Sequence, residues 1–590
     1  MHNKIYGVLL LLLTLSISQV EAQKSNLKWW NPSSNSFKTI EGQGWSDDIA
    51  TYQRLPNNAK ENVRKAVWDL STNSAGLSIR FRTNSDRIVV RYKTGGGLSM
   101  PHMPATGDSG VDIYAKDCDG AWHWCRGRYS FGDTIKYDFS GLNPKEPYHN
   151  LGREYRLYLP LYNDVKFLEI GIPDEHKFEV LPLRNEKPIV VYGTSITQGA
   201  CASRPGMAWT NILSRTLDHP IVNLGFSGNG RLEDELFSLL SEIDAKLYVI
   251  DCLPNMVPGV GFSADDAYNR MIKGVKFLKS KRPNTPILLV EHSGYSDGDL
   301  DKERGRIYTS LNKVLKKAYE ELVSAGIEDL HLLTRNEINL DLNSYVDGTH
   351  PSDLGMMQYA TAYDKSIRKV LNQPTGVYST MKPVTQYREP GSYDWDARHQ
   401  TILAMNKVVA PEVCVIGNSI MHYWSGEPKA IWHRGDEAWK KLWGDKKVRN
   451  MACGWDRIEN VLWRVYHGQL DGFDAKQIVM KIGTNNLQHN TDEEILAGLK
   501  LLVQAVKSRQ PKSKLLMVGI LPRRDMEQRI AKLNQQIARI AASENVSYVN
   551  VGKSFLNEAG KINESLFSDG LHPNKEGYEI LSEGLKKHVQ

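Results

Sequence analysis

The chain has 590 residues, enough for about three to five domains, and its apolar (41%) and charged (24%) fractions are those of globular proteins. With 74 basic and 68 acidic residues interspersed, the formal charge of +6 is too dilute to indicate a nucleic-acid partner. Six cysteines are too few for a disulfide scaffold, and no apolar run after residue 20 is long enough for a multi-span membrane protein.

The first 22 residues have the features of a secretory signal peptide. Lys4 precedes a short apolar run over residues 8–15, and the tripeptide at 20–22 is a small-x-small cleavage site. The alternative is an uncleaved anchor, but the apolar run is short for a membrane span. No cysteine follows the cleavage site, so a lipoprotein anchor is not indicated. We expect an exported protein, periplasmic or secreted, without a stable membrane anchor.

Residues 23–184 predict an antiparallel β-sandwich of the jelly-roll type. Apolar and polar residues alternate over 77–82, 88–92 and 155–159, which is the pattern of strands with one buried face. Within this region Trp122 and Trp124 flank His123. Two interpretations remain open for these aromatic rings: stacking on sugar rings, or packing within a hairpin.

Residues 185–373 change to short apolar runs that alternate with amphipathic stretches of helical length, which predicts a parallel sheet covered by helices on both faces. A Pro- and Gly-containing stretch over 374–396 predicts a linker. The same alternation then restarts over 397–590, so the second half is predicted to be a divergent copy of the first α/β unit. The predicted strands are 188–192, 221–224, 247–250, 287–290 and 331–333, and then 413–416, 448–451, 478–480, 515–518 and 546–549.

Each copy has a serine directly after its first predicted strand and an Asp-x-x-His pair near its end. These residues are Ser195, Asp347 and His350 in the first copy, and Ser419, Asp569 and His572 in the second. The Ser-to-Asp intervals are 152 and 150 residues. Serine needs a base to act as a nucleophile, neutral histidine is the usual base near pH 7, and an aspartate on the same loop orients the imidazole. Because the same serine, aspartate and histidine recur at nearly the same intervals in both copies, nucleophilic catalysis by serine is favoured over a chance arrangement.

An acyl-transfer site also needs donors for the developing oxyanion. In the first copy the backbone N–H of Gly228 follows the second strand, the side-chain amide of Asn255 follows the third, and Ser195 offers its own N–H. In the second copy Asn485 lies in the sequence Gly-Thr-Asn-Asn after the third strand.

Together these blocks resemble the SGNH (GDSL-type) hydrolase superfamily over residues 185–590. The resemblance implies flavodoxin-like, three-layer α/β domains with a serine nucleophile, a histidine base, an aspartate and a Gly/Asn oxyanion hole. The second copy is similar to the platelet-activating-factor acetylhydrolase branch in residues 450–456, 461–464 and 483–486. Residues 110–114 are similar to the signature of the β-sandwich that precedes some exported bacterial carbohydrate esterases.

The two copies depart from the family pattern at several positions. Thr194 and Asn418 replace the usual aspartate before the nucleophile, and Asn255 lacks its usual Gly-Thr-Asn-Asp context. The oxyanion glycine position of the second copy falls on Trp455, whose backbone N–H is still a donor but whose indole is expected to narrow the pocket.

The cysteines raise two candidate disulfides, and the mechanism implies no cofactor or metal. Cys118 and Cys125 bracket a turn, while Cys201 and Cys252 are both expected near strand ends in one crevice. No cysteine has the spacing of a zinc site.

We therefore expect an exported serine esterase that removes small acyl groups, most simply O-acetyl, from an acylated glycan. Two alternatives stay open: a lipid-type acylhydrolase, and a glycan-binding protein with one or both hydrolase copies inert. The sequence does not indicate the oligomeric state.

Overall fold

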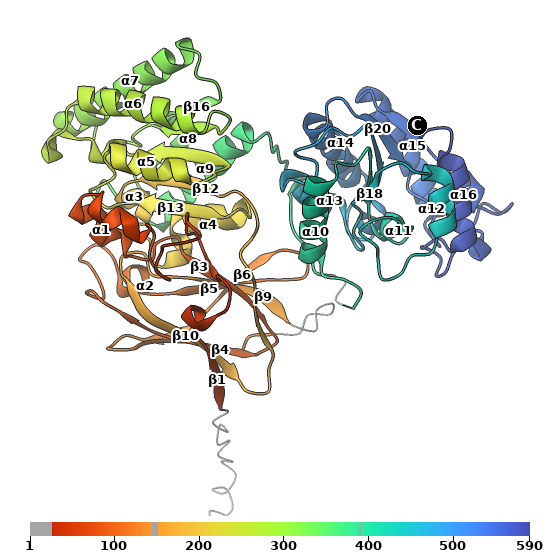
Figure 1. The fold of residues 1–590 in the computed structure, drawn as a ribbon, viewed down its shortest axis with the longest axis horizontal. Helices are drawn as coiled ribbons and strands as arrows, with labels where there is room; N and C mark the ends of the chain where they lie inside the picture. Colours follow the sequence, from red (N-terminus) through yellow and green to blue (C-terminus); the bar gives the residue numbers. More distant parts are fainter. Residues whose placement is uncertain (1–25, 144–151, 389–390, 590) are drawn as a thin grey trace, which may run out of the picture.

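The computed structural model describes residues 26–143, 152–388 and 391–589, so the predicted signal peptide over 1–22 lies outside the described residues. Figure 1 shows a β-rich part at the amino-terminal end, a first α/β part stacked on it, and a second α/β part to one side. Within the described ranges, no helix combines the length and apolar character needed to cross a membrane.

The amino-terminal part is a sandwich of two antiparallel sheets, as predicted. Alternate residues of the strands, such as Ile79, Phe81, Val90 and Leu157, point between the sheets and form its core. The first sheet has the order β1 (Leu27–Trp30), β10 (Val165–Pro173), β4 (Arg87–Thr94), β8 (Ile135–Ser140) and β7 (Arg128–Ser130). The second has β11 (Phe178–Val180), β3 (Ser78–Thr83), β9 (Arg153–Tyr158), β5 (Asp112–Lys116) and β6 (Trp122–Cys125), with β2 (Ile40–Glu41) beside β3. Two short helices, α1 (Lys65–Ser71) and α2 (Ala105–Asp108), lie in the connections.

The first α/β domain has a five-stranded parallel sheet of order 2-1-3-4-5, which is the flavodoxin-like order. Its strands are β13 (Ile221–Gly225), β12 (Ile189–Gly193), β14 (Leu247–Asp251), β15 (Ile287–Val290) and β16 (Leu330–Leu333). Its helices are α3 (Ser195–Gln198), α4 (Trp209–Thr216), α5 (Asp234–Glu242), α6 (Ala264–Lys281), α7 (Lys302–Ser324), α8 (Arg335–Ile338) and α9 (Asp353–Val370).

The second α/β domain repeats the same strand order. Its strands are β18 (Val448–Asn450), β17 (Val413–Gly417), β19 (Gln477–Lys481), β20 (Lys514–Val518) and β21 (Ser547–Val549). Its helices are α10 (Trp395–Val408), α11 (Ser419–His422), α12 (Asp436–Trp443), α13 (Ile458–Tyr466), α14 (Asp492–Arg509), α15 (Glu527–Ser543) and α16 (Lys575–Leu585). All ten predicted α/β strands are found, each with its ends within two residues of the prediction.

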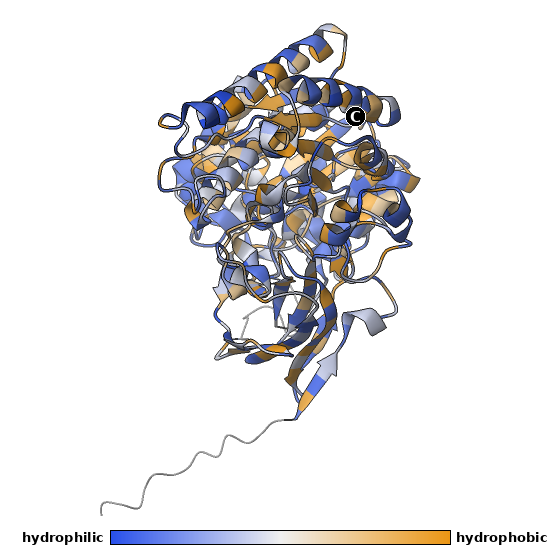
Figure 2. Ribbon diagram, turned by 90° about the vertical axis from the view of Figure 1, so that its left-hand side faces the viewer, coloured by the Kyte–Doolittle hydropathy of each residue, from blue (hydrophilic) through white to orange (hydrophobic). Residues whose placement is uncertain are grey.

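The apolar runs that predicted these strands are buried on both faces of the sheets. Every residue of β12, β14 and β17 is buried, and separate core clusters fill the two sides of each sheet. The covering helices are amphipathic, and Figure 2 shows hydrophilic and hydrophobic segments alternating along them. Because both faces are covered, the accessible part of each sheet is the crevice at the carboxyl ends of its strands.

The three parts are joined through buried charge. Asp218 of the first α/β domain forms an ion pair with Lys116 of the sandwich, at 3.0 Å. It also accepts a hydrogen bond from the indole N–H of Trp463 of the second α/β domain, at 3.2 Å. Burial tends to raise the pKa of Asp218, but Lys116 and the neighbouring arginines lower it to about 2. The carboxylate therefore stays charged and ties all three domains together.

The stretch predicted as a linker is packed rather than loose. Thr380 and Gln386 are fully buried, and Tyr387 donates its backbone N–H to Cys118 of the sandwich at 2.9 Å. The Tyr387 hydroxyl donates to Glu154 at 3.0 Å. Val384 and Gln386 also contact the second α/β domain, at Glu459 and Gly454. Residues 380–388 therefore form a strap against the sandwich and the second α/β domain.

Both disulfide predictions are wrong, because all six cysteines are thiols. Cys125 pairs with Ile113 across the hairpin, whereas Cys118 lies beyond the Lys116–Trp122 pair, about 10 Å or more along the strands. A disulfide needs Cα atoms within about 7 Å.

The second predicted pair fails because the two thiols face different surroundings. The thiol of Cys252 donates to the Tyr192 carbonyl at 3.6 Å inside the core, whereas Cys201 faces His350.

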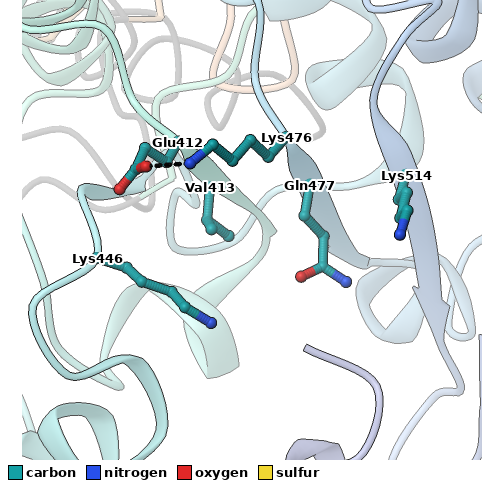
Figure 3. A pocket seen from close by; sticks show the side chains of 6 residues that line it. All are labelled: Glu412, Val413, Lys446, Lys476, Gln477 and Lys514. Carbon is teal, nitrogen blue, oxygen red and sulfur yellow. Dashed lines mark hydrogen bonds and ion pairs between the residues drawn. The ribbon is translucent and has the colours of Figure 1, made fainter. Parts of the chain in front are cut away.

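A cavity of about 420 Å³ lies at the amino ends of the strands of the second sheet (Figure 3), whereas Ser419 follows the carboxyl end of β17. It is lined by the first residues of three strands, Val413, Gln477 and Lys514, together with Glu412, Lys446 and Lys476. Glu412 and Lys476 form an ion pair at 2.6 Å in its lining. Since these are amino ends of strands, the cavity is separate from the crevice where the predicted site residues gather.

Candidate active site

The serine of the first copy stands at the start of a one-turn helix directly after the central strand β12. The side chain of Thr194 accepts from the Ile196 N–H and so caps α3. A Cβ on Gly193 would lie only 2.1 Å from Thr197 Oγ1, so the tight strand-to-helix turn requires glycine there. This turn places Ser195, 7% exposed, at the carboxyl edge of the sheet.

The structure brings Ser195, His350 and Asp347 into one hydrogen-bonded line. Ser195 Oγ lies 2.8 Å from His350 Nε2, and His350 Nδ1 lies 2.7 Å from Asp347 Oδ2. The other carboxylate oxygen accepts the backbone N–H groups of His350 at 2.8 Å and Thr349 at 3.0 Å. A carboxylate opposite Nδ1 favours the tautomer with its proton on Nδ1, which leaves Nε2 as the acceptor that faces Ser195.

The electrostatics of this loop keep the carboxylate charged. Partial burial tends to raise the pKa of Asp347, but the backbone N–H and the ring of His350 outweigh burial and hold the pKa below its ordinary value. Arg304 donates to the Gly348 carbonyl and to Thr349 Oγ1, both at 3.2 Å, which fixes the loop from the other side.

The predicted oxyanion donors of the first copy lie in loops that hold them in place. Gly228 has a φ of +67°, a left-handed conformation that favours glycine, and the space beside its Cα is open. Asn255 Oδ1 accepts the Gly230 N–H at 3.1 Å, which leaves the amide Nδ2 available as a donor.

The second copy has the same arrangement. His572 Nε2 lies 2.8 Å from Ser419 Oγ, and His572 Nδ1 lies 2.7 Å from Asp569 Oδ2. Asn418 caps α11 as Thr194 caps α3, with Ser419 5% exposed. As in the first copy, backbone N–H and imidazole contacts hold the pKa of Asp569 below its ordinary value against the effect of burial.

Trp455 adopts the backbone conformation of the glycine that it replaces. Its φ is +62°, close to the +67° of Gly228, although the left-handed region costs a non-glycine residue roughly 1–2 kcal/mol. The N–H of Trp455 is thus held as the glycine N–H is held in the first copy. Asn485 Nδ2 donates one hydrogen to the Asp456 carbonyl at 2.9 Å, so its second hydrogen remains for a ligand.

The sandwich contributes two residues to the first site that sequence reasoning missed. The Tyr162 hydroxyl donates to the Ser195 carbonyl at 3.2 Å, and the ring of His102 lies 5.8 Å from the ring of His350. Both are in loops far from residue 195 in sequence, and neither belongs to a motif, so only the docking of the two domains reveals them.

Aromatic side chains form the rim of the second site. The ring of Tyr423 lies 5.9 Å from the ring of His572 and 6.1 Å from Trp432. Trp432 is 51% exposed and Trp455 is 38% exposed. The two sites therefore share one hydrogen-bonded core but differ in their walls.

The two tryptophans of the Trp122–Trp124 segment fit different interpretations of the two left open: Trp122 is packed, whereas Trp124 is exposed. Trp122 is half-buried between two cations, with Lys116 and Arg156 within 5 Å of its ring centroid. Trp124 is 49% exposed, and its indole N–H donates to Asp112 at 2.9 Å.

Among the residues that the structure describes, two groups of side chains have the donors and the proximity to hold a metal ion, each with one ligand atom per residue and these atoms within 4.8 Å of one another. One group is His102, Cys201, Asp347 and His350; the other is Glu186, His219 and His467. The latter lies buried between the two α/β domains.

Comparison with known proteins identifies the class of these domains. The GDSL-like lipase/acylhydrolase family matches residues 186–368 and again 415–580, and the amino-terminal domain of SGNH-hydrolase-type esterases matches residues 27–178. The chain belongs to the GDSL-like, or SGNH, acylhydrolases, and it is a carboxylic ester hydrolase with two copies of the hydrolase domain.

Two relatives show how far the similarity extends. Platelet-activating factor acetylhydrolase IB subunit alpha2 of Rattus norvegicus is 30% identical over 204 residues, which cover 34% of this chain and 85% of the relative. The crystal structure of a GDSL-like lipase from Bacteroides ovatus is 31% identical, with a TM-score of 0.53, and covers 59% of this chain and 98% of that one. The predicted relation to this superfamily and to its acetylhydrolase branch is confirmed.

Proposed function

We propose that both copies act as serine esterases on small acyl esters of carbohydrate, most simply O-acetyl groups, and that the protein is exported. The observation that carries the proposal is the recurrence of one Ser–His–Asp geometry, with contacts of 2.8 and 2.7 Å, at the carboxyl ends of both parallel sheets. A serine in hydrogen-bond contact with an oriented imidazole is the arrangement for nucleophilic acyl transfer.

The reaction follows from the geometry in the first copy. His350 Nε2 takes the proton of Ser195 Oγ as the oxygen attacks the ester carbonyl carbon, and Asp347 stabilises the imidazolium that forms. The N–H groups of Ser195 and Gly228 and the Nδ2 of Asn255 receive the oxyanion. The tetrahedral intermediate collapses as His350 returns the proton to the leaving alcohol oxygen. Water then attacks the acyl-enzyme by the same route and releases the acid.

In the second copy the same steps use Ser419, His572 and Asp569, and the N–H of Trp455 replaces that of glycine. No step in either copy needs a metal or a cofactor.

The walls of the sites support a small acyl group on a sugar. Ser195 and Ser419 are only 7% and 5% exposed, so the acyl group must enter a confined space. The exposed rings of Trp432 and Trp455 beside the second site offer flat apolar faces, which match the apolar faces of pyranose rings.

A lipid-type substrate is the second candidate. Trp432 at the rim of the second site and its sequence neighbour Ile431, 51% and 66% exposed, would also contact an acyl chain or an interface. The acetylhydrolase relative is consistent with an acetyl group on either type of alcohol.

Chain-length profiling separates the two candidates. Acetyl, butyryl and octanoyl esters of one chromogenic alcohol are compared with acetylated xylan, mannan and a phospholipid. Acetate release from a glycan, with kcat/KM falling steeply beyond butyryl, supports the proposal. A preference for octanoyl or phospholipid substrates would refute it. Export is tested by sequencing the amino terminus of the secreted or periplasmic protein, which we expect to begin at Gln23.

A further inference from the structure

The first site contains a set of metal-ligand side chains that ester hydrolysis does not require. One donor atom from each of His102, Cys201, Asp347 and His350 lies within 4.8 Å of the other three. In a tetrahedral zinc site with bonds of about 2.0–2.3 Å, neighbouring ligand atoms are about 3.3–3.8 Å apart. The four donors are therefore within about 1.5 Å of closing around such an ion.

The four side chains are held there by separate parts of the fold. His102 lies between Met100 and Met103, which exchange two backbone hydrogen bonds of 3.0 Å and close the loop of the sandwich. Cys201 follows α3 at a φ of +69° and is 6% exposed. Asp347 and His350 belong to the loop before α9, which Arg304 braces. The cluster thus exists only because the sandwich docks on the first α/β domain.

The chemistry of the set suits one class of ion. Two imidazoles, a thiolate and a carboxylate are the ligands of Zn²⁺ and similar borderline-soft divalent cations. The thiolate and the carboxylate together balance a charge of +2, so the complex would be neutral. Cys201 is buried, and its sulfur lies within 4.8 Å of a donor atom of Asp347. A cation bound there favours the thiolate form of Cys201 over the thiol.

We propose that the first copy binds a zinc-class divalent cation through His102, Cys201, Asp347 and His350, and that this ion switches off ester hydrolysis by that copy alone. Binding releases the Cys201 proton to solvent and changes no oxidation state. If the ion takes Nδ1 of His350, the single ring proton resides on Nε2, and the ring presents N–H instead of a lone pair to Ser195. If it takes Nε2, the contact with Ser195 is lost directly. The inhibition, though not the binding, rests on the proposed roles of Ser195 and His350.

The second copy is an internal control. Ser425 stands six residues after Ser419, where Cys201 stands after Ser195, and its hydroxyl is hydrogen-bonded to Asp436. Within the described parts of the chain, the structure has no group of metal-ligand side chains of this kind around Ser419. A general effect of zinc on histidine-dependent esterases would inhibit both copies equally.

The activity test uses zinc chloride and a chromogenic acetyl ester. Ser419→Ala reports on the first copy and Ser195→Ala on the second. We expect the half-inhibitory zinc concentration to be at least ten-fold lower in Ser419→Ala, and inhibition to be reversed by a chelator. Adding His102→Ala or Cys201→Ser to Ser419→Ala should raise the half-inhibitory zinc concentration to that of the second copy. The matched thiol variant Cys118→Ser should leave this concentration unchanged. Equal inhibition of both copies, or no effect of Cys201→Ser, would overturn the proposal.

A binding test does not depend on turnover. Cobalt(II), used as a spectroscopic substitute for zinc, gives a thiolate-to-metal charge-transfer band in the near ultraviolet when cysteine ligates it. The mature protein should show this band, and Cys201→Ser should lose it while Cys118→Ser keeps it. A band that persists in Cys201→Ser, or no band at all, refutes the site. A band in a protein without esterase activity would support the site and reject the proposed function.

Discussion

Two substitutions of Asp347, to Asn and to Ala, distinguish its two roles. One role is to orient the His350 imidazole, and the other is to stabilise the charge of the imidazolium. In Asp347→Asn the amide oxygen can still accept the two backbone N–H groups that Asp347 Oδ1 accepts at 2.8 and 3.0 Å. The amide NH₂ then faces His350 Nδ1, where the carboxylate oxygen lies at 2.7 Å. A donor opposite Nδ1 favours the His350 tautomer that carries its proton on Nε2. In that tautomer Nε2 presents an N–H to Ser195 and cannot accept the Ser195 proton. Asp347→Ala has no such donor, and water can accept from Nδ1 in its place.

The magnitudes follow from the exposure of the pair. Two unit charges about 4 Å apart attract by about 1 kcal/mol in water and about 4 kcal/mol at an effective dielectric constant of 20. The Asp347 side chain is 37% exposed, so solvent screening places the value between these limits, at about 2–3 kcal/mol. Asp347→Ala should therefore lower kcat/KM by about 10²-fold. Asp347→Asn adds the tautomer penalty and should cost about ten-fold more.

The assay measures kcat/KM for a chromogenic acetyl ester in the Ser419→Ala background, so that only the first copy contributes. Asp569→Asn and Asp569→Ala in the Ser195→Ala background form the matched pair for the second copy. Circular dichroism and the unfolding midpoint establish that each variant is folded. If Asp347→Asn were as active as Asp347→Ala, or more active, the assigned tautomer would be wrong.

Two further predictions concern the oxyanion donor and acid stability. In the Ser419→Ala background, Asn255→Ala should lower kcat by about 10²–10³-fold. Asn255→Asp keeps the acceptor for Gly230 and should be no better, and near-normal activity of either variant would remove Asn255 from the site. His292 is buried with its pKa lowered to about 3, so the unfolded chain alone takes up a proton as pH falls below 6.5. The contribution of His292 to the free energy of unfolding should therefore decrease by about 2 kcal/mol as the pH falls from 7 to 5. The Gly294 N–H donates to His292 Nδ1 at 2.9 Å, and His292→Asn keeps an acceptor for it. This variant should reduce the loss of unfolding free energy between pH 7 and 5 in urea titrations, and an unchanged pH slope would contradict the assignment.

The α/β architecture was predictable because its signals are local. Each strand buried on both faces appears as a continuous apolar run, and the runs at 189–193 and 413–417 lie within a residue of their predicted ends. The Ser–His–Asp sets were predictable for a different reason. Chain order in a parallel sheet delivers the first and last loops of the domain to the same edge, so Ser195 and His350 meet although 155 residues separate them.

Features that depend on docking between domains were not predictable. His102 and Tyr162 carry no motif, and the sandwich brings them to the site only by its placement. The spacing of Cys118 and Cys125 in the sequence likewise does not reveal the hairpin register that separates them. The Pro- and Gly-containing stretch predicted as a linker packs because Gln386 and its neighbours find polar partners in the second α/β domain and in the sandwich.

The most direct test of two working copies is acetate release by four proteins: the unsubstituted protein, Ser195→Ala, Ser419→Ala and the double variant. We expect each single variant to keep part of the activity and the double variant to lose several orders of magnitude in kcat/KM. If one single variant abolished turnover, the other copy would be inert on that ester. A double variant as fast as the unsubstituted protein would contradict the assignment of both serines.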